Sequence, residues 1–334
     1  MDPLTQGVFG SLWAQAGSGG TRLRRAAGAG LVAGMAPDLD VLIRSPDDAL
    51  LFIDYHRHFT HAIPFAPLGG LVVALALWPL LGRSLGFWRL YLYCFLGYLS
   101  HGLLDACTSY GTYLLWPFSE TRFAWNWISI IDPIFTLPLV ALAGLALVRR
   151  LPQWSWLALA WAGMYLGLGA VQHERAEEAL AGWAASNGVA VDRHVVKPSF
   201  GNLILWRGVI EEGDHLRAVA IRQVPFTDTR VYPGGKVVRF HPSAVGGDAG
   251  LQSDLKRFAY FSDGWLFRHG PMESGDNRFV GDFRYSMDPA GTGPLWGIHF
   301  NPDVPGGRVR FERVRNIDPG VRRQFLSRLL GEAP

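Results

Sequence analysis

Apolar segments of bilayer length constrain this chain of 334 residues more than any other feature of its sequence. Four of them, 62–81, 87–107, 128–148 and 154–171, are each near the roughly 20 residues that a helix needs to cross a bilayer core. The composition agrees, because 49% of residues are hydrophobic and only 18% are charged. We therefore expect residues 1–171 to form a membrane-embedded α-helical bundle.

Two shorter apolar stretches, 4–16 and 26–43, precede these segments, and the second is interrupted by "APDLD". Irregular backbone is tolerated at membrane depth where protein or water covers it. Both stretches are expected to be short or re-entrant helices that pack on the longer ones.

From residue 172 onward, charged residues become frequent and the apolar residues alternate. The pattern "HERAEEALAGWAASNG" predicts a helix that ends at a glycine. Strand-length patterns follow in "NLILWRGVI", "HLRAVAIRQV", "KVVRFH", "RFAYFSDGWLFRHG", "RFVGDFRYSM", "LWGIHF" and "RVRFERV", and "VRRQFLSRLLG" predicts a last helix. Residues 172–334 should form an α+β domain with an antiparallel sheet.

Arginines indicate the orientation in the membrane. Arg83 and Arg89 flank the loop between the first two long segments, and Arg149 and Arg150 separate the last two. Positively charged loops remain in the cytoplasm. The chain is thus expected to be a multi-pass membrane protein, with residues 172–334 on the extracytoplasmic side.

Ionisable residues gather at four places in or beside the apolar segments. They are Asp38 and Asp40 in "PDLD", His56, His58 and His61 in "HRHFTH", His101 and Asp105 in "SHGLLDA", and Asp132 in "IIDP". Such residues are costly in a membrane and usually face a bundle interior or a water-filled site. In the expected topology all four places reach the extracytoplasmic end of the bundle.

The spacing of these residues favours a metal site. His101 and Asp105 are four residues apart and share one face of a helix, as His58 and His61 do if their segment is helical. Imidazole and carboxylate together suit a divalent ion, with zinc favoured and Mn²⁺ or Mg²⁺ as alternatives. Eight candidates exceed the roughly four ligands of one zinc ion, so either two metals bind or some groups orient the ligands.

Part of this set also fits simpler structural roles. The histidines of "HRHFTH" could form a cationic patch at the membrane interface, and aspartates beside prolines are often helix caps. The convergence of four separate places on one membrane depth favours the metal site.

The chain resembles the membrane-bound metal-dependent hydrolases that include the LexA-regulated inner-membrane hydrolase group. The resemblance rests on "MDPLTQG", "GMAPDLDVL", "HRHFTHA", "LGYLSHGLLDACTSYGTYLLWPFS" and "RFAWNWISIIDPIF", and it covers about residues 1 to 150. It implies metal-dependent hydrolysis without naming a substrate. Members commonly have His where this chain has Gln6.

We therefore predict a membrane enzyme that hydrolyses a phosphoester or lipid-linked substrate with a metal-activated water. The candidate ligands are His58, His61, His101 and Asp105, with Asp38, Asp40 and Asp132 completing a second metal position or orienting the histidines. His56 is the candidate base, and Asp132 a further catalytic candidate. Arg57 and Arg122 could clamp an anionic substrate, since guanidinium groups match phosphate geometry.

Two rival functions remain open. The same polar groups could form an ion path in a transporter or another metal-handling protein, or the bundle could only anchor the C-terminal domain. Nucleic-acid binding is not expected, because the net charge is only +3 and the basic residues are dispersed. Membrane lipids are the expected surroundings.

Overall fold

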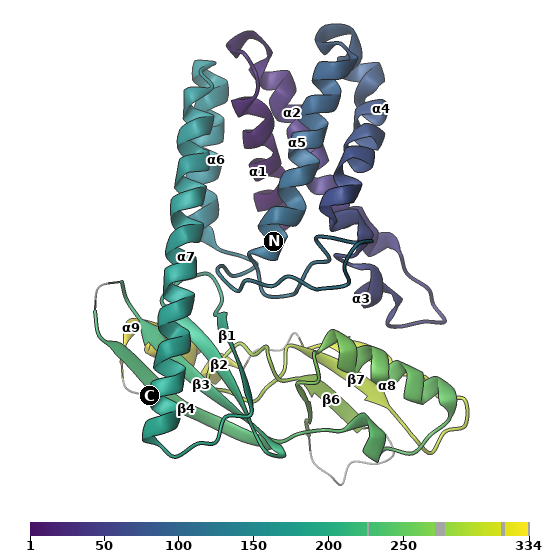
Figure 1. The fold of residues 1–334 in the computed structure, drawn as a ribbon, viewed down its shortest axis with the longest axis vertical. Coiled ribbons are helices and arrows are strands. Elements are labelled where there is room, and N and C mark those ends of the chain that lie inside the picture. Colours follow the sequence, from purple (N-terminus) through teal and green to yellow (C-terminus); the bar gives the residue numbers. More distant parts are fainter. Residues whose placement is uncertain (226, 271–277, 315–317, 333–334) are drawn as a thin grey trace. The chain divides into compact units, whose positions relative to one another are not determined.

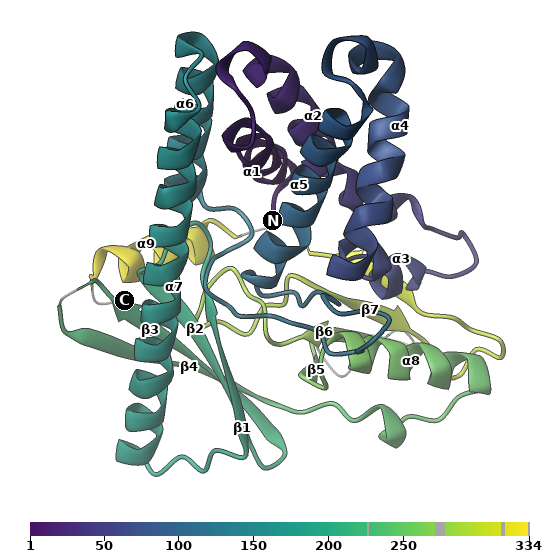
Figure 2. The same ribbon diagram turned by 45° about the horizontal axis from the view of Figure 1, so that its top comes forward.

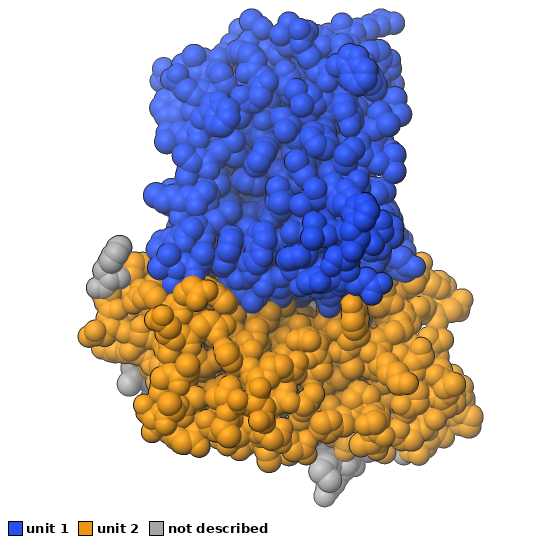
Figure 3. All heavy atoms as spheres, viewed as in Figure 1, with its two compact units in different colours: residues 1–43, 55–171, 200–202 blue, residues 44–54, 172–199, 203–334 orange. Residues whose placement is uncertain are grey.

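The computed structural model describes residues 1–225, 227–270, 278–314 and 318–332. Contacts divide the chain into two compact units, coloured separately in Figure 3. Unit 1 comprises Met1–Ile43, Tyr55–Val171 and Phe200–Asn202, and unit 2 comprises Arg44–Asp54, Gln172–Ser199 and Leu203–Pro334.

Unit 1 is helical. Its elements are α1 (Pro3–Ala16), η1 (Gly20–Arg22), α2 (Leu23–Met35), η2 (Ala36–Leu42), η3 (Phe59–His61), η4 (Ile63–Phe65), α4 (Ala66–Leu85), α5 (Phe87–Ala106), α6 (Pro133–Arg149) and the first part of α7 (Gln153–Ser186). Helices α1, α2, α4 and α5 lie side by side in both Figure 1 and Figure 2. The two short apolar stretches near the N-terminus thus form helices packed on the longer ones, as expected.

Glycines let the backbones of α1, α2 and α5 touch. A Cβ atom built on Gly10 would lie 2.6 Å from the carbonyl oxygen of Gly30, and one on Gly97 would lie 2.6 Å from that same oxygen. No side chain fits at these positions without moving a helix. Small residues at helix interfaces are a common means of close packing in membrane proteins.

Two helices of the described residues are long and apolar enough to cross a membrane: Ile63–Leu85 and Gln153–Ser186. They coincide with two of the four expected segments. Segment 87–107 forms α5, whose polar residues lower its hydropathy, and segment 128–148 becomes helical only from Pro133, as a shorter apolar helix. Helix α7 continues to Ser186, so the separate helix expected after residue 172 is its second half.

The outer face of α4 is apolar. Leu68, Val72 and Leu75 recur at helical spacing and are between 52% and 58% exposed. A contiguous exposed apolar face is typical of a surface that contacts lipid or a partner protein.

Unit 2 contains two antiparallel four-stranded sheets in sequential strand order. One comprises β1 (Arg193–Pro198), β2 (Leu205–Glu212), β3 (His215–Gln223) and β4 (Thr229–Val238), and the other β5 (Leu266–Arg268), β6 (Arg278–Asp282), β7 (Trp296–Phe300) and β8 (Arg310–Arg313). Helices α3 (Leu51–Tyr55), α8 (Ala249–Phe261) and α9 (Pro319–Leu330) and the turn η5 (Pro242–Ala244) complete the described elements. The predicted order of a helical part followed by antiparallel sheet is confirmed.

Helix α8 corrects one strand prediction. The residues "RFAYF" at 257–261 form the end of this helix, and only Leu266–Arg268 of the predicted strand pairs in a sheet. Asp248 caps the helix by accepting a hydrogen bond from the N–H of Leu251, and Leu251, Leu255 and Phe258 are buried at helical spacing. Strand β1 has no counterpart among the predicted strands.

Candidate metal site

Four side chains of unit 1 converge in the interior. Asp38 comes from η2, His61 from η3, and His101 and Asp105 from one face of α5. One nitrogen or oxygen atom of each lies within 4.8 Å of those of the other three. We call these four residues the His–Asp group.

The distances within the His–Asp group suit a small divalent ion. The Nε2 atoms of His61 and His101 are 2.9 Å apart, and each lies 3.5 Å from Asp38 Oδ1. Asp105 Oδ2 is 3.4 Å from the His61 nitrogen and 3.7 Å from that of His101. Ligand atoms about 2.0–2.1 Å from a tetrahedral zinc ion are roughly 3.3–3.4 Å from one another. The group therefore fits a metal without large movement.

A backbone carbonyl fixes the tautomer of His101. Its Nδ1 lies 2.6 Å from the carbonyl oxygen of Gly34, which can only accept a hydrogen bond. Nδ1 must therefore carry the proton, and in the neutral ring Nε2 presents a lone pair to the His–Asp group.

Side chains fix the tautomer of His61 in the same way. Thr60 donates its hydroxyl hydrogen to Asp40 Oδ2 at 2.9 Å, so the lone pair of that hydroxyl accepts from His61 Nδ1 at 3.0 Å. Asp40 Oδ2 is also 3.3 Å from this Nδ1. A carboxylate behind a histidine is the arrangement that orients metal-binding imidazoles.

Two neutral imidazoles in these tautomers would place lone pairs against each other, so a cation must lie between them. In the metal-free protein that cation is a proton. Burial disfavours charge on His61, but its contacts with Asp105, Asp38 and Asp40 outweigh burial and raise its pKa to about 10. A divalent ion would take the place of this proton.

Asp105 is held from several sides. Its Oδ1 accepts a hydrogen bond from Gln6 Nε2 at 2.9 Å and also contacts the amino group of Met1. Its Oδ2 is buried and, within the described residues, accepts no hydrogen bond, although Arg57 Nε is an ion-pair partner at 3.1 Å. This buried carboxylate oxygen faces the imidazole nitrogens of both His61 and His101, a position from which it can ligate an ion held between them.

Close backbone contacts set the positions of these side chains. A Cβ atom on Gly102 would lie 2.1 Å from the carbonyl oxygen of His61, and one on Gly34 would lie 2.6 Å from that of Gln6. Glycine at 102 allows η3 to approach α5, and glycine at 34 allows α2 to approach α1. The sequence thus brings the ligand-bearing elements together by omitting side chains.

Asp40 also contacts His56, the first histidine of the motif "HRHFTH". Its Oδ1 lies 2.8 Å from His56 Nδ1, and its Oδ2 accepts the backbone N–H of Arg57 at 3.0 Å. The side chain of His56 is 34% exposed, whereas those of His61 and His101 are buried. His56 is therefore the most exposed of these three histidines.

Arg57 lies inside the site. It is 5% exposed, its Nη1 donates to Thr108 at 2.8 Å, and its guanidinium packs over the ring of Tyr110. Its backbone has φ of 64°, which is unusual for a residue other than glycine. Backbone strain of this kind often occurs at functional sites.

Six predicted site residues are not part of the His–Asp group. Asp40, His56 and Arg57 are described above, and the other three are His58, Asp132 and Arg122. The ring of His58 packs against Tyr113 and Trp116, with centroids 4.7 and 5.4 Å away. Asp132 caps α6, the role that an aspartate beside a proline often has, and accepts a hydrogen bond from Tyr165 at 2.9 Å. Arg122 donates to the carbonyl oxygen of Tyr110 at 2.7 Å.

The structure adds residues that the sequence did not indicate. Thr60 and the carbonyl of Gly34 position the two histidines, and Thr108 positions Arg57. No pattern marks a threonine or a main-chain carbonyl as a partner of a ligand. Gln6 was singled out only through the family resemblance.

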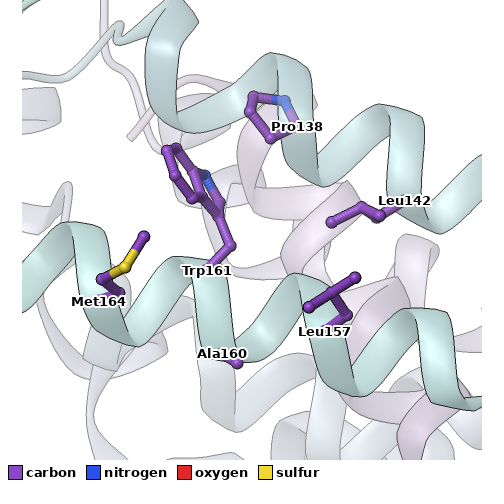
Figure 4. A pocket seen from close by; sticks show the side chains of 6 residues that line it. All are labelled: Pro138, Leu142, Leu157, Ala160, Trp161 and Met164. Carbon is purple, nitrogen blue, oxygen red and sulfur yellow. The ribbon is translucent and has the colours of Figure 1, made fainter.

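A pocket elsewhere in unit 1 offers no comparable chemistry. It lies between α6 and α7 and has a volume of about 370 Å³ (Figure 4). Its lining consists of Pro138, Leu142, Leu157, Ala160, Trp161 and Met164. An apolar lining without ionisable groups does not support catalysis.

A comparison with known protein families matches the half of the chain that contains the candidate site. Residues 1–176, which include the whole His–Asp group, match the model of the YdjM inner membrane protein family. The chain is 33% identical over 114 residues to the uncharacterized protein YfhP of Bacillus subtilis (strain 168), covering 34% of each chain. It is 38% identical over 104 residues to the inner membrane protein YbcI of Escherichia coli (strain K12), covering 30% of this chain and 57% of that one.

The matches thus span about a third and slightly more than half of the lengths of these two relatives. No solved structure matches the chain.

Proposed function

Because the chain belongs to the YdjM inner membrane protein family, we propose that it is a metal-dependent hydrolase embedded in the inner membrane. The His–Asp group binds a divalent ion, with zinc favoured over Mn²⁺ or Mg²⁺. The substrate is a phosphoester or a lipid-linked molecule.

One observation carries this proposal: two buried imidazole nitrogens face each other at 2.9 Å beside the oxygens of two carboxylates. Their tautomers leave both lone pairs toward the same point. A set of two nitrogen and two oxygen ligands favours zinc among the common divalent ions.

A divalent ion in this group would supply a water molecule whose pKa is lowered toward neutrality, and hence a nucleophile. His61, His101 and Asp105 have fully buried side chains, whereas that of Asp38 is 21% exposed. Water and substrate therefore approach the group from the side of Asp38.

His56 is the general base. Asp40 accepts the proton of His56 Nδ1, so Nε2 carries the lone pair that can accept a proton from the attacking water. The same carboxylate lies behind His61, so Asp40 aligns the base and one ligand together. This pairing of an aspartate with a partly exposed histidine is typical of proton-transferring groups.

The two arginines have different roles. Arg57 balances the charge of Asp105, because its guanidinium is buried against that carboxylate. Arg122 is less buried and packs beside Tyr113, so it is the better candidate to contact an anionic substrate. The apolar helices of the unit favour a substrate that reaches the site from the lipid phase.

Metal content tests the proposal. Elemental analysis of the detergent-purified full chain should find about one divalent ion per chain, and hydrolysis of bis(p-nitrophenyl) phosphate should disappear with it on chelation. His61→Ala should lose both metal and hydrolysis. His58→Ala, which changes the same motif outside the His–Asp group, should retain the metal.

The opposite pattern would assign the metal to His58 and reject the proposed ligand set. Metal binding without hydrolysis of phosphoesters or lipid phosphates, together with metal flux in proteoliposomes, would favour the transporter instead.

A further inference from the structure

The segment Arg44–Asp54 connects two parts of the candidate metal site. Asp38 and Asp40 precede it, and His56 and His61 follow it, and all four belong to unit 1. The segment itself makes its contacts within unit 2. The chain therefore leaves the unit of the site between two groups of site residues and then returns to it.

One arginine of unit 2 holds the segment at two points. Arg257, in α8, binds both carboxylate oxygens of Asp48 at 3.0 and 2.9 Å, and its Nε donates to Asp54 at 2.8 Å. Asp254 is a third carboxylate partner of Arg257 at 3.4 Å and is itself bound by Arg308 at 2.7 Å.

A ring contact supports the same attachment. Phe52 meets Phe311 edge-on, with ring centroids 5.0 Å apart. The side chains of Arg257, Asp48 and Asp54 are 24%, 26% and 35% exposed, so the ion pairs are partly shielded from water. Paired hydrogen bonds from one guanidinium fix geometry better than a single surface ion pair does.

We propose that Arg257 is a positioning residue for the metal site, which it influences through the segment Arg44–Asp54. Asp54 precedes His56 by two residues, and α3, which contains it, leads directly into the His56–His61 stretch. Fixing Asp48 and Asp54 limits the conformations of the chain on both sides of the segment. The ligands then need less ordering when the metal binds.

This inference rests on the proposed metal site. It gives Arg257 of unit 2 a role in positioning the ligands of that site. Arg257 contacts no residue of the His–Asp group in the described structure. Its replacement should thus weaken metal binding without removing a ligand. Partners that orient metal ligands typically change affinity by about 10- to 100-fold, and an effect through a connecting segment belongs near the lower end.

Cobalt binding provides the test, since Co²⁺ reports both affinity and ligand geometry through its visible absorption. Arg257→Met in the detergent-purified full chain should raise the Kd for Co²⁺ about 10-fold and keep the wild-type spectrum at saturation. Asp48→Asn should act in the same direction, and adding it to Arg257→Met should change little, because both act as one unit.

Arg217→Met is the matched control. Arg217 forms an ion pair with Glu212 at 3.1 Å in unit 2, and among the described residues no ion pair joins it to the segment. Its replacement should leave the Kd for Co²⁺ unchanged. Hydrogen exchange of the metal-free proteins should show faster exchange in residues 44–61 for Arg257→Met only, and Arg257→Lys should restore part of the protection.

The outcomes separate the two proposals. A wild type that binds no Co²⁺ would remove the metal site, and this inference with it. A wild type that binds Co²⁺, beside folded Arg257→Met and Asp48→Asn variants with unchanged Kd, would overturn the positioning role alone. Weakening by Arg217→Met as large as by Arg257→Met would also overturn it.

Discussion

His61 receives more carboxylate contacts than the other histidines of its motif. Asp40 stands behind its ring, and Asp38 and Asp105 face its Nε2 at 3.5 and 3.4 Å. These contacts retain a proton on the metal-free ring at neutral pH. The same atoms therefore bind a proton or a metal, but not both at once.

The affinity for metal should rise steadily with pH. Because the pKa of His61 is raised to about 10, the ring is protonated at pH 7 and each bound ion must displace about one proton. Affinity should then increase about tenfold per pH unit from pH 6 to pH 8.5, as measured by Co²⁺ titration. If the imidazole had an ordinary pKa, the metal affinity would stop rising above roughly pH 6.5. A plateau of the affinity from pH 7 would therefore contradict this prediction.

At the scale of elements, the sequence predicted which segments become helices better than it predicted how they meet. Apolar length identified α1, α2, α4 and α7, and alternation identified most strands of unit 2. The sequence predicted a strand at residues 257–261, where the structure has the end of α8. Periodicity alone does not distinguish a strand from a helix in such a short apolar run.

The motif "HRHFTH" shows the same limit inside the site. From the spacing of three residues, both His58 and His61 are predicted to be metal ligands on one helix face. The structure has only a short turn at Phe59–His61, preceded by the left-handed backbone of Arg57. This turn sends His61 to α5 and His58 toward Tyr113, and no periodic pattern contains that information.

Helix α2 offers a test of glycine packing. Gly34→Ala should destabilise the protein by about 1–3 kcal/mol, because its Cβ atom would lie 2.6 Å from the carbonyl oxygen of Gln6. It should also weaken Co²⁺ binding, since the Gly34 carbonyl holds His101. Thermal unfolding in detergent measures the first effect and titration the second.

Gly28→Ala is the control in the same helix. A Cβ atom there would meet nothing within 4 Å. Alanine favours a helix by up to about 1 kcal/mol over glycine, so this variant should be as stable as the wild type or slightly more stable. Equal losses in both variants would show that close packing is not the cause.

At the scale of the whole molecule, the arginine pattern predicts sidedness. Both native cysteines are buried, so single introduced cysteines at exposed positions can report it. In intact spheroplasts, a membrane-impermeant maleimide should label Glu120→Cys and Ser253→Cys, but not Ser84→Cys, which lies at the end of α4 beside Arg83.

If Ser84→Cys alone were labelled, the orientation would be the reverse of the predicted one. The candidate site would then lie on the cytoplasmic side. Permeabilised cells supply the reference, because all three variants should react there. The predicted sidedness rests on the charge distribution along the sequence.

The hydrogen bond from His101 to the carbonyl of Gly34 limits what mutation can do to this protein. Every residue has a main-chain carbonyl, so no substitution at position 34 deletes this acceptor, whereas single changes at Thr60 or Asp40 remove the partners of His61. A point mutation can therefore remove the partner of His61 Nδ1 directly, whereas it can remove the partner of His101 Nδ1 only by moving a helix. Transfer of the site to another scaffold would therefore require the backbone conformation at Gly34 as well as the four side chains of the His–Asp group.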